Sequence, residues 1–135
     1  SGIGISSLLM MKEGISVTAI EQNLYSVALA KENALRNGMN PDAFIEGNVE
    51  SLIETYLEQF DTVLINPPRQ GLMKEVVEAL VKFKPKEIIY ISCMPSTLAR
   101  DLKELNPYYS VNRVQAFDMF PQTGHIETLI NLCSN

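Results

Sequence analysis

Two short apolar segments constrain the fold of this chain more than any other feature. Phe60–Ile65 reads FDTVLI and Glu87–Ser92 reads EIIYIS, and both are apolar and β-branched over most of their length. Strands of this kind are typical of parallel sheets that are covered by helices on both faces. Gly71–Phe83, between them, has the apolar spacing of a helix. The chain is therefore predicted to adopt an α/β fold with a mainly parallel sheet.

The other segments continue this alternation, and no linker or repeat divides the 135 residues. A hydrophobic content of 46% with 20% charged residues is typical of a globular chain. We therefore expect a single domain over residues 1–135. Leu8–Lys12 is predicted to be the end of a first helix. Further strands are predicted at Ile15–Ile20, Ala43–Ile45, Tyr108–Phe117 and Ile126–Leu132, and further helices at Asn23–Asn37, Val49–Leu57 and Ser96–Leu105.

Charge and cysteine content exclude several functions. The net charge of −5 argues against strong binding of nucleic acid by this chain alone, because phosphate contact needs a basic surface. Cys93, Cys133 and a single histidine, His125, have no metal-site spacing, so no metal is expected. No apolar run has the length of a membrane span and no signal peptide is visible. A reducing cytoplasm is the expected compartment, with no membrane partner.

Polar or reactive residues stand where several predicted strands end. Glu21, Asn66 and Cys93 directly follow apolar strands, and Asn48 follows a short one. In a doubly wound sheet, ligands bind beyond the carboxyl ends of the strands. One shared site is therefore predicted from these four residues.

The segment SGIG at the start of the chain opens a predicted helix. Gly2 and Gly4 would let the backbone approach a ligand, and Glu21 stands where a carboxylate binds ribose hydroxyls. The third glycine of the dinucleotide fingerprint is absent, with Ser7 in its place, which favours a nucleoside over a pyrophosphate. An ordinary turn with a surface glutamate is the alternative.

Two asparagines have both structural and functional interpretations. Asn48, after Gly47, is suited to an adenine edge or to a simple turn. Asn66 is followed by Pro67 and Pro68, whose stiff backbone would hold its amide toward a substrate. The alternative for Asn66 is a strand-to-helix breaker, and we favour the functional interpretation.

Cys93 follows a buried strand and precedes Pro95 and a predicted helix. Helix N-termini favour the thiolate, which would make Cys93 a nucleophile. The alternative is a small buried side chain, the common fate of a free cysteine. Farther on, His125 and Glu127 in DMFPQTGHIET are candidate bases, or members of a polar loop between two strands.

Six segments, taken in order, resemble the catalytic domain of the RNA uridine-5-methyltransferases. They are SGIG, AIE, EGN, INPPRQGL, YISCMPSTLARDL and DMFPQTGHIET. The resemblance implies a Rossmann-like class I methyltransferase fold, with three α/β/α layers and an antiparallel last strand. It also implies S-adenosyl-L-methionine as cofactor and RNA as substrate.

The resemblance also implies roles for individual residues. Gly2, Gly4 and Glu21 would hold the methionine and ribose parts of the cofactor, and Asn48 would lie near its adenine. Asn66 would contribute to the cofactor site, and Arg69 and His125 would contact the substrate. Cys93 matches the nucleophile that adds to C6 of uracil, and Glu127 matches the proposed general base.

The chain departs from the family pattern at three points. Asn66 replaces the usual Asp of a DPPR motif. The family's first strand and its upstream RNA-binding portion have no counterpart in this sequence, so the chain is expected to be a fragment. The segment FPQT favours ribosomal RNA over transfer RNA as the substrate. An amino-group methyltransferase of the Asn-Pro-Pro type, and an inactive cofactor-binding scaffold, are the competing hypotheses.

Overall fold

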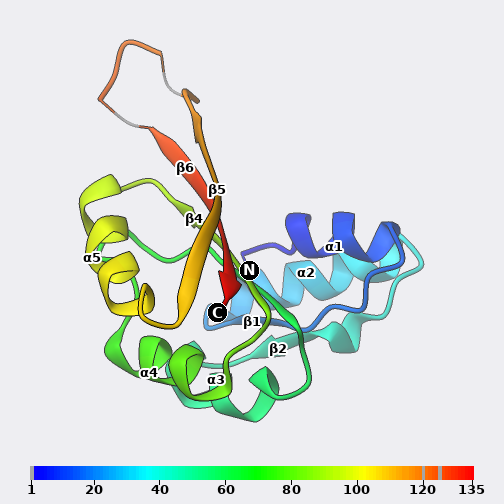
Figure 1. The fold of residues 1–135 in the computed structure, drawn as a ribbon. Coiled ribbons are helices and arrows are strands. Elements are labelled where there is room, and N and C mark those ends of the chain that lie inside the picture. Colours follow the sequence, from blue (N-terminus) through cyan, green and yellow to red (C-terminus); the bar gives the residue numbers. More distant parts are fainter. Residues whose placement is uncertain (1, 120, 125) are drawn as a thin grey trace. The chain divides into compact units, whose positions relative to one another are not determined.

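The computed structural model describes residues 2–119, 121–124 and 126–135, and its chain forms two compact units, residues 1–52 and 53–135 (Figure 1). Helix α3 (Val49–Leu57) begins in the first unit and ends in the second. Within the described part of the chain, no helix is long and apolar enough to cross a membrane.

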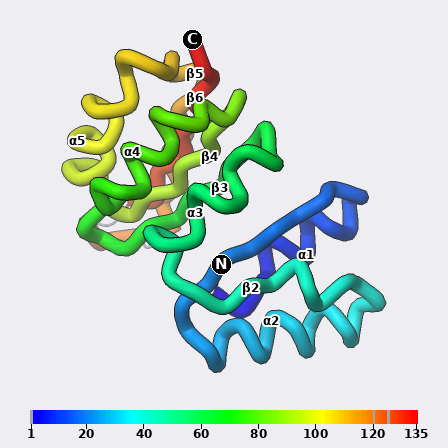
Figure 2. The backbone as a smooth tube through the Cα atoms, turned by 90° about the horizontal axis from the view of Figure 1, so that it is seen from below, coloured from blue at the N-terminus to red at the C-terminus, as the bar shows by residue number. Residues whose placement is uncertain are grey.

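The first unit is a pair of parallel strands with two α-helices alongside, as Figures 1 and 2 show. Asn23 begins the second helix, because its side-chain oxygen accepts a hydrogen bond from the backbone N–H of Ser26 at 3.0 Å. The elements are α1 (Ile5–Lys12), β1 (Ala19–Glu21), α2 (Leu24–Arg36), the 3₁₀ turn η1 (Pro41–Ala43) and β2 (Phe44–Glu46).

Small residues on one face of α2 form the core of this unit. Val27, Ala30 and Ala34 are buried at helical spacing and pack with Ala19 and Phe44. Alanine at two of these positions lets the helix approach the strands closely. The ring of Phe44, which is 2% exposed, fills the space between them.

The second unit contains a four-stranded sheet in the order β3-β4-β6-β5. β3 and β4 pair in parallel, whereas β6 is antiparallel to both β4 and β5. α4 and α5 contact each other and lie alongside the sheet (Figures 1 and 2). The elements are β3 (Thr62–Ile65), α4 (Lys74–Phe83), β4 (Glu87–Ser92), α5 (Pro95–Leu105), β5 (Tyr109–Phe117) and β6 (Glu127–Ser134).

The two helices of this unit pack on the sheet through narrow buried stripes. α4 buries Val76, Ala79 and Leu80, and the hydroxyl of Tyr109 on β5 donates to the backbone carbonyl of Leu80 at 3.0 Å. Burial of each large aliphatic side chain contributes about 1.5–3 kcal/mol. α5 buries Leu98 and Leu105, and also a carboxylate, Asp101.

The predicted alternation of strands and helices is confirmed, and so is the antiparallel last strand, β6. Two elements begin at least three residues later than predicted. The strand predicted at Ile15–Ile20 pairs only from Ala19, because the backbone N–H of Ile15 is bonded to the end of α1 through the carbonyl of Met10. The helix predicted from Gly71 begins at Lys74, because Gly71 has a positive φ of 81° and Met73 is extended, with ψ of 153°, so neither residue is helical.

The strands form two sheets where the sequence predicts one. Among the described strands, β1 is hydrogen-bonded only to β2, and β3 only to β4. The two-stranded sheet lies in the first unit and the four-stranded sheet in the second. The carboxyl ends of β1 and β2 carry one set of predicted site residues, and one end of the larger sheet carries the other.

Candidate active site

The register of the larger sheet brings Cys93 and Glu127 to the same level. In the antiparallel pair of β4 and β6, Ser92 lies opposite Thr128, the last pair of the ladder. Cys93 directly follows β4, and Glu127, the residue before Thr128, is the first residue of β6. Residues opposite each other in such ladders have Cα atoms about 4.5–5.5 Å apart. The predicted nucleophile and the predicted base therefore stand beside each other at one end of the sheet.

Asn66 lies at the same end. It directly follows β3, whose last residue, Ile65, pairs in parallel with Tyr90 of β4. Asn66 and Arg69 are both exposed in the segment that leaves this strand. The larger sheet thus brings together four of the predicted residues: Asn66, Arg69, Cys93 and Glu127.

Cys93 is held between a tight turn and a helix start. The Ser92 hydroxyl, on a residue only 5% exposed, accepts from the backbone N–H of Met94 at 3.1 Å and donates to its carbonyl at 3.2 Å. α5 begins at Pro95, where proline is suited to the first helical turn. Cys93 is half-buried and has no disulfide partner. It is therefore fixed in backbone position and accessible.

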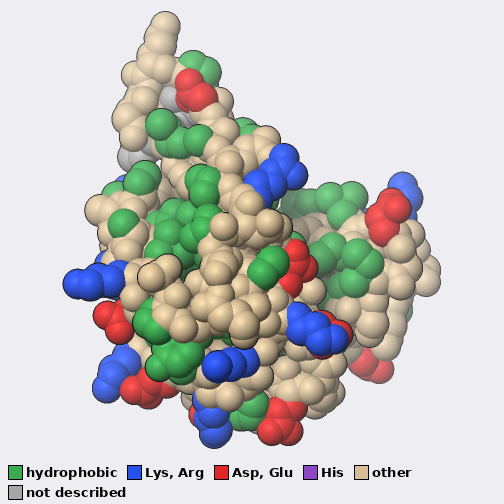
Figure 3. Space-filling model, in the orientation of Figure 1, with side chains coloured by type: hydrophobic (Ala, Val, Ile, Leu, Met, Phe, Trp, Pro, Cys, Tyr) green, Lys and Arg blue, Asp and Glu red, His purple; other side chains and the backbone are tan. Residues whose placement is uncertain are grey.

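Exposed apolar side chains flank this end of the sheet. Phe117 closes β5 opposite Glu127, and Met119 and Ile126 are 64% and 43% exposed. Figure 3 shows hydrophobic side chains in green along the protruding hairpin of β5 and β6. Such surfaces are suited to stacking or packing against an unpaired base.

In the first unit, the carboxylate of Glu21 fastens the glycine turn. One oxygen accepts from the backbone N–H of Gly2 at 2.8 Å and the other from that of Asn23 at 2.9 Å. Partial burial raises the pKa of this carboxyl, but the hydrogen bonds from Asn23 and Gly2 are among the contacts that bring the pKa down to about 2. Glu21 is therefore ionised throughout the neutral range, at the carboxyl end of β1.

The two glycines of the turn have different surroundings. A Cβ on Gly2 would meet nothing within 4 Å, so the space above this residue is open. A Cβ on Gly4 would lie 2.7 Å from the ring of Phe44 and 3.0 Å from Ala30. Both residues have positive φ, 55° and 84°. Gly4 is thus needed for packing, and its cofactor role stays a prediction, as does that of Gly2.

Asn48 ends the loop after β2 and begins α3. Its side-chain oxygen accepts from the backbone N–H of Glu50 at 2.9 Å, and its backbone carbonyl accepts from Ser51 and Leu52. The residue is exposed. The turn role is therefore confirmed, and contact with an adenine stays a prediction.

The sequence did not reveal a polar cluster on α5. Asp101 is 2% exposed; one oxygen accepts from the Tyr90 hydroxyl at 2.6 Å and from the backbone N–H of Leu72 at 2.8 Å. The other accepts from Nε and Nη2 of Arg100 at 2.9 and 2.7 Å. Burial and the neighbouring Asp101 carboxylate raise the pKa of Tyr90 far above its ordinary value. The available signal was a carboxylate within the apolar stripe of Leu98 and Leu105.

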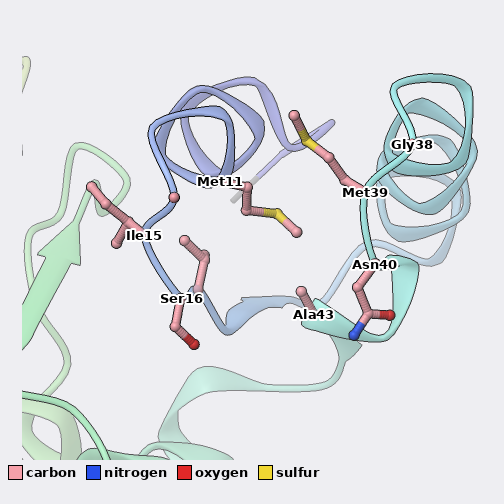
Figure 4. A pocket seen from close by; sticks show the side chains of 9 residues that line it. Met11, Ile15, Ser16, Gly38, Met39, Asn40 and Ala43 are labelled. Carbon is pink, nitrogen blue, oxygen red and sulfur yellow. The ribbon is translucent and has the colours of Figure 1, made fainter.

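A separate pocket of about 410 Å³ lies in the first unit (Figure 4). Its walls include Met11, Ile15, Met39 and Ala43, which precede β1 and β2 or end the helices. It is therefore at the opposite end of the strand pair from Glu21. None of the predicted site residues lines it.

Two further predictions concern His125 and a metal site. His125 lies outside the described residues. Among residues 2–119, 121–124 and 126–135, no three His, Cys, Asp or Glu side chains group as ligands for a metal ion.

Comparison with known proteins supports a methyltransferase fold and family. The sequence model of the family described as tRNA (Uracil-5-)-methyltransferase matches residues 15–134. An uncharacterized RNA methyltransferase of Protochlamydia amoebophila is 47% identical over 135 residues, covering 97% of this chain and 31% of that protein. One from Thermotoga maritima is 38% identical, covering 98% and 30%. The chain thus spans about a third of the length of these relatives.

Comparison with solved structures supports the same fold. The tRNA (uracil-54, C5)-methyltransferase of Pyrococcus abyssi, in complex with S-adenosyl-L-homocysteine, is 34% identical with a TM-score of 0.87, covering 98% of this chain and 32% of that one. A predicted O-methyltransferase from Agrobacterium tumefaciens, 17% identical, has a TM-score of 0.74 and covers 100% and 71%. The latter likeness concerns the fold alone. The Rossmann-like class I methyltransferase fold expected from the sequence is confirmed.

Proposed function

Because the chain belongs to the tRNA (uracil-5-)-methyltransferase family, we propose that it carries the chemistry of an RNA (uracil-C5)-methyltransferase. The reaction moves a methyl group from S-adenosyl-L-methionine to C5 of a uridine. One observation carries the proposal: Cys93 and Glu127 leave adjacent strands at the same level, at the end of the sheet where Asn66 also lies.

The residues of the first unit fit the proposed cofactor. The half-buried carboxylate of Glu21 lies at the carboxyl end of β1, and a carboxylate only accepts hydrogen bonds, which suits it to ribose hydroxyls. The open space above Gly2 suits the methionine part. Asn48, exposed after β2, is suited to the adenine. Bound there, the cofactor supplies a methyl group on a positively charged sulfur.

Cys93 is proposed as the nucleophile and Glu127 as the general base in the reaction of the uracil ring. Uracil C5 is a weak nucleophile, and addition of the Cys93 thiolate to C6 converts the ring to an enolate that is nucleophilic at C5. After methylation, Glu127 takes the proton from C5. The electrons of the broken C–H bond form the C5–C6 double bond, and the Cys93 thiolate leaves. These steps restore the C5–C6 double bond of the uracil ring and the free cysteine.

Contacts to the RNA are proposed for residues around this end of the sheet. Arg69 is exposed and suited to a phosphate, and His125 is a further proposed contact. Asn66, at the same end of the sheet, belongs to the proposed cofactor site; it keeps the shape of the usual Asp, and its amide both donates and accepts hydrogen bonds. The target uridine must leave its stack for C6 to reach Cys93. The net charge of −5 argues against strong binding of RNA by this chain alone.

A double-label assay tests the proposal with the complete gene product. The protein is incubated with S-adenosyl-L-methionine carrying a ¹⁴C methyl group and with RNA transcribed from [5-³H]uridine. Methylation at C5 releases one tritium for each methyl group transferred. Transfer without tritium release would contradict the C5 reaction and favour the amino-group methyltransferase suggested by Asn66-Pro67-Pro68.

The transfer assay, combined with calorimetry, separates the remaining alternatives. Calorimetric binding of S-adenosyl-L-methionine without transfer to any RNA would favour a cofactor-binding scaffold. The motif FPQT favours ribosomal RNA, whereas the Pyrococcus abyssi protein is named for transfer RNA. Both RNA classes are therefore offered as substrates, and the one that accepts the methyl group identifies the target.

A further inference from the structure

The segment between β3 and α4 is anchored to α5 at three points, at Arg69, Gln70 and Leu72. Thr97 Oγ1 lies 3.0 Å from the carbonyl oxygen of Arg69, and it shares its hydrogen with the carbonyl of Met94 at 3.1 Å. Nη2 of Arg100 donates to the carbonyl of Gln70 at 2.8 Å. The carboxylate of Asp101 accepts from the backbone N–H of Leu72 at 2.8 Å.

We call Thr97, Arg100 and Asp101 the α5 clamp. Among the described residues, the hydrogen-bond partners of the Asp101 carboxylate are all donors: the Leu72 amide, the Tyr90 hydroxyl and two nitrogens of Arg100. Such a set fits an ionised carboxylate, which only accepts hydrogen bonds. A buried charge of this kind is costly unless it is fully paired. The arrangement is therefore specific to aspartate at this position.

The glycine in the anchored segment is fitted to the clamp. Gly71 has φ of 81°, and its N–H closes the turn by donating to the carbonyl of Pro68 at 2.9 Å. A Cβ at Gly71 would lie 2.5 Å from Oδ2 of Asp101 and 2.6 Å from Nη2 of Arg100. The segment thus approaches the clamp as closely as backbone can.

The clamp joins two parts of the proposed active site. Asn66 and Arg69 lie at the start of the segment that it holds, and Cys93 lies two residues before α5 begins. Since helices are stiff, a clamp on the first two turns of α5 fixes the segment relative to the start of that helix. Tyr90 ties the same carboxylate to β4, three residues before the nucleophile.

From this geometry, and resting on the proposed function, we propose that Asp101 is a positioning residue for methyl transfer. It holds the segment carrying Asn66 and Arg69 in register with Cys93, and does not itself contact substrate. Positional errors near 1 Å in an active site cost about 100-fold in rate. The clamp therefore sets the rate of the chemical step more than the affinity for the cofactor.

The main test is Asp101→Asn in the complete gene product, assayed with the ¹⁴C and ³H labels at saturating substrates. The amide turns an NH₂ group toward donors, so the clamp opens. We expect kcat to fall about 10- to 100-fold and KM for S-adenosyl-L-methionine to rise by less than kcat falls, because Asn66 alone of the proposed cofactor residues lies in the held segment. Glu104→Gln, an exposed carboxylate-to-amide change on the same helix, is the control and should match wild type.

Two milder changes keep the test decisive if Asp101→Asn fails to fold. Tyr90→Phe removes one donor to Asp101 without changing the ring. Thr97→Val removes the hydroxyl that holds Arg69, whereas Thr97→Ser retains it. We expect kcat to fall in Tyr90→Phe and Thr97→Val and to be restored in Thr97→Ser, each compared at a temperature where circular dichroism shows a folded protein.

The possible outcomes distinguish a failure of the positioning role of Asp101 from a failure of the proposed function. Folded clamp variants that lose thermal stability but transfer ¹⁴C at the wild-type rate would overturn the positioning role, leaving a purely structural one. Wild-type transfer of ¹⁴C without ³H release would overturn the C5 reaction, and the clamp would still be judged on the ¹⁴C rate. No transfer by wild type would overturn both.

Discussion

Glu21 in the first unit and Asp101 in the second each hold a loop by accepting hydrogen bonds from its backbone, but the protein encloses them to different degrees. Asp101 is 2% exposed, whereas Glu21 is half-buried. Four donors from the chain surround Asp101. The enclosed carboxylate is suited to positioning other groups, and the more open one to meeting a ligand.

The same contrast extends to the residues around each carboxylate. Glu21 stands beside Gly2, above which the space is open, whereas Asp101 stands beside Gly71, where no Cβ fits. The first region thus has the features of a binding site, and the second those of a support for the reacting groups. Substitutions in the two regions should therefore affect different kinetic parameters.

The largest effect is expected at Cys93, in the reacting region. Cys93→Ala removes the nucleophile, so methyl transfer should fall by about 10³-fold or more. Calorimetry should give wild-type affinity for S-adenosyl-L-methionine, since the cofactor residues are untouched. Cys133→Ala, which changes the other free cysteine, is the matched control. Normal turnover by Cys93→Ala would refute the nucleophile assignment and the division between the regions.

The next effect separates two glycines of the binding region. Gly4→Ala drives a Cβ into the Phe44 ring and should lower the free energy of unfolding by about 2–4 kcal/mol, from strain and overpacking. Gly2→Ala has only the positive-φ cost, about 1–2 kcal/mol. Urea unfolding measures both. Equal losses would show that Gly4 is not required for packing.

A smaller effect is expected from Glu21→Gln. Hydrogen bonds to a charged group contribute about 1.5–3 kcal/mol, so loss of the charge should weaken cofactor binding roughly 10-fold. Because kcat depends on the second unit, it should change little at saturating cofactor. A fall in kcat with unchanged affinity would reverse the roles given to the two carboxylates.

The smallest effect is a pH dependence of stability due to Glu21. Its folded pKa, about 2, lies below the ordinary 4.5, so its charged form stabilises the fold. This contribution is fully present above pH 4.5 and is lost as the pH falls toward 2. The difference in melting temperature between wild type and Glu21→Gln should therefore be constant from pH 7 to 5 and shrink below 4.5. A difference that grows on acidification would contradict the hydrogen bonds assigned to this carboxylate.

Local patterns were sufficient to predict the strand ends and the residues on them. Apolar segments such as EIIYIS mark buried strands, and Cys93 follows directly in the chain. What escaped prediction depends on contacts distant in sequence. The non-helical segment before α4 is held by the bond from the Leu72 N–H to Asp101, 29 residues away. The packing role of Gly4 likewise depends on Phe44, which only the folded chain brings near.

The central claim is that Cys93 attacks C6 of a uridine, and capture of that adduct tests it most directly. The complete gene product is incubated with S-adenosyl-L-methionine and RNA containing 5-fluorouridine, whose C5 carries fluorine where a proton must leave. After methylation no proton remains at C5 for Glu127 to remove, so the adduct should persist. Mass spectrometry of the digested complex should find the methylated nucleotide on the peptide that contains Cys93. An enzyme active on ordinary RNA that forms no such adduct, or forms it on another residue, would contradict the account.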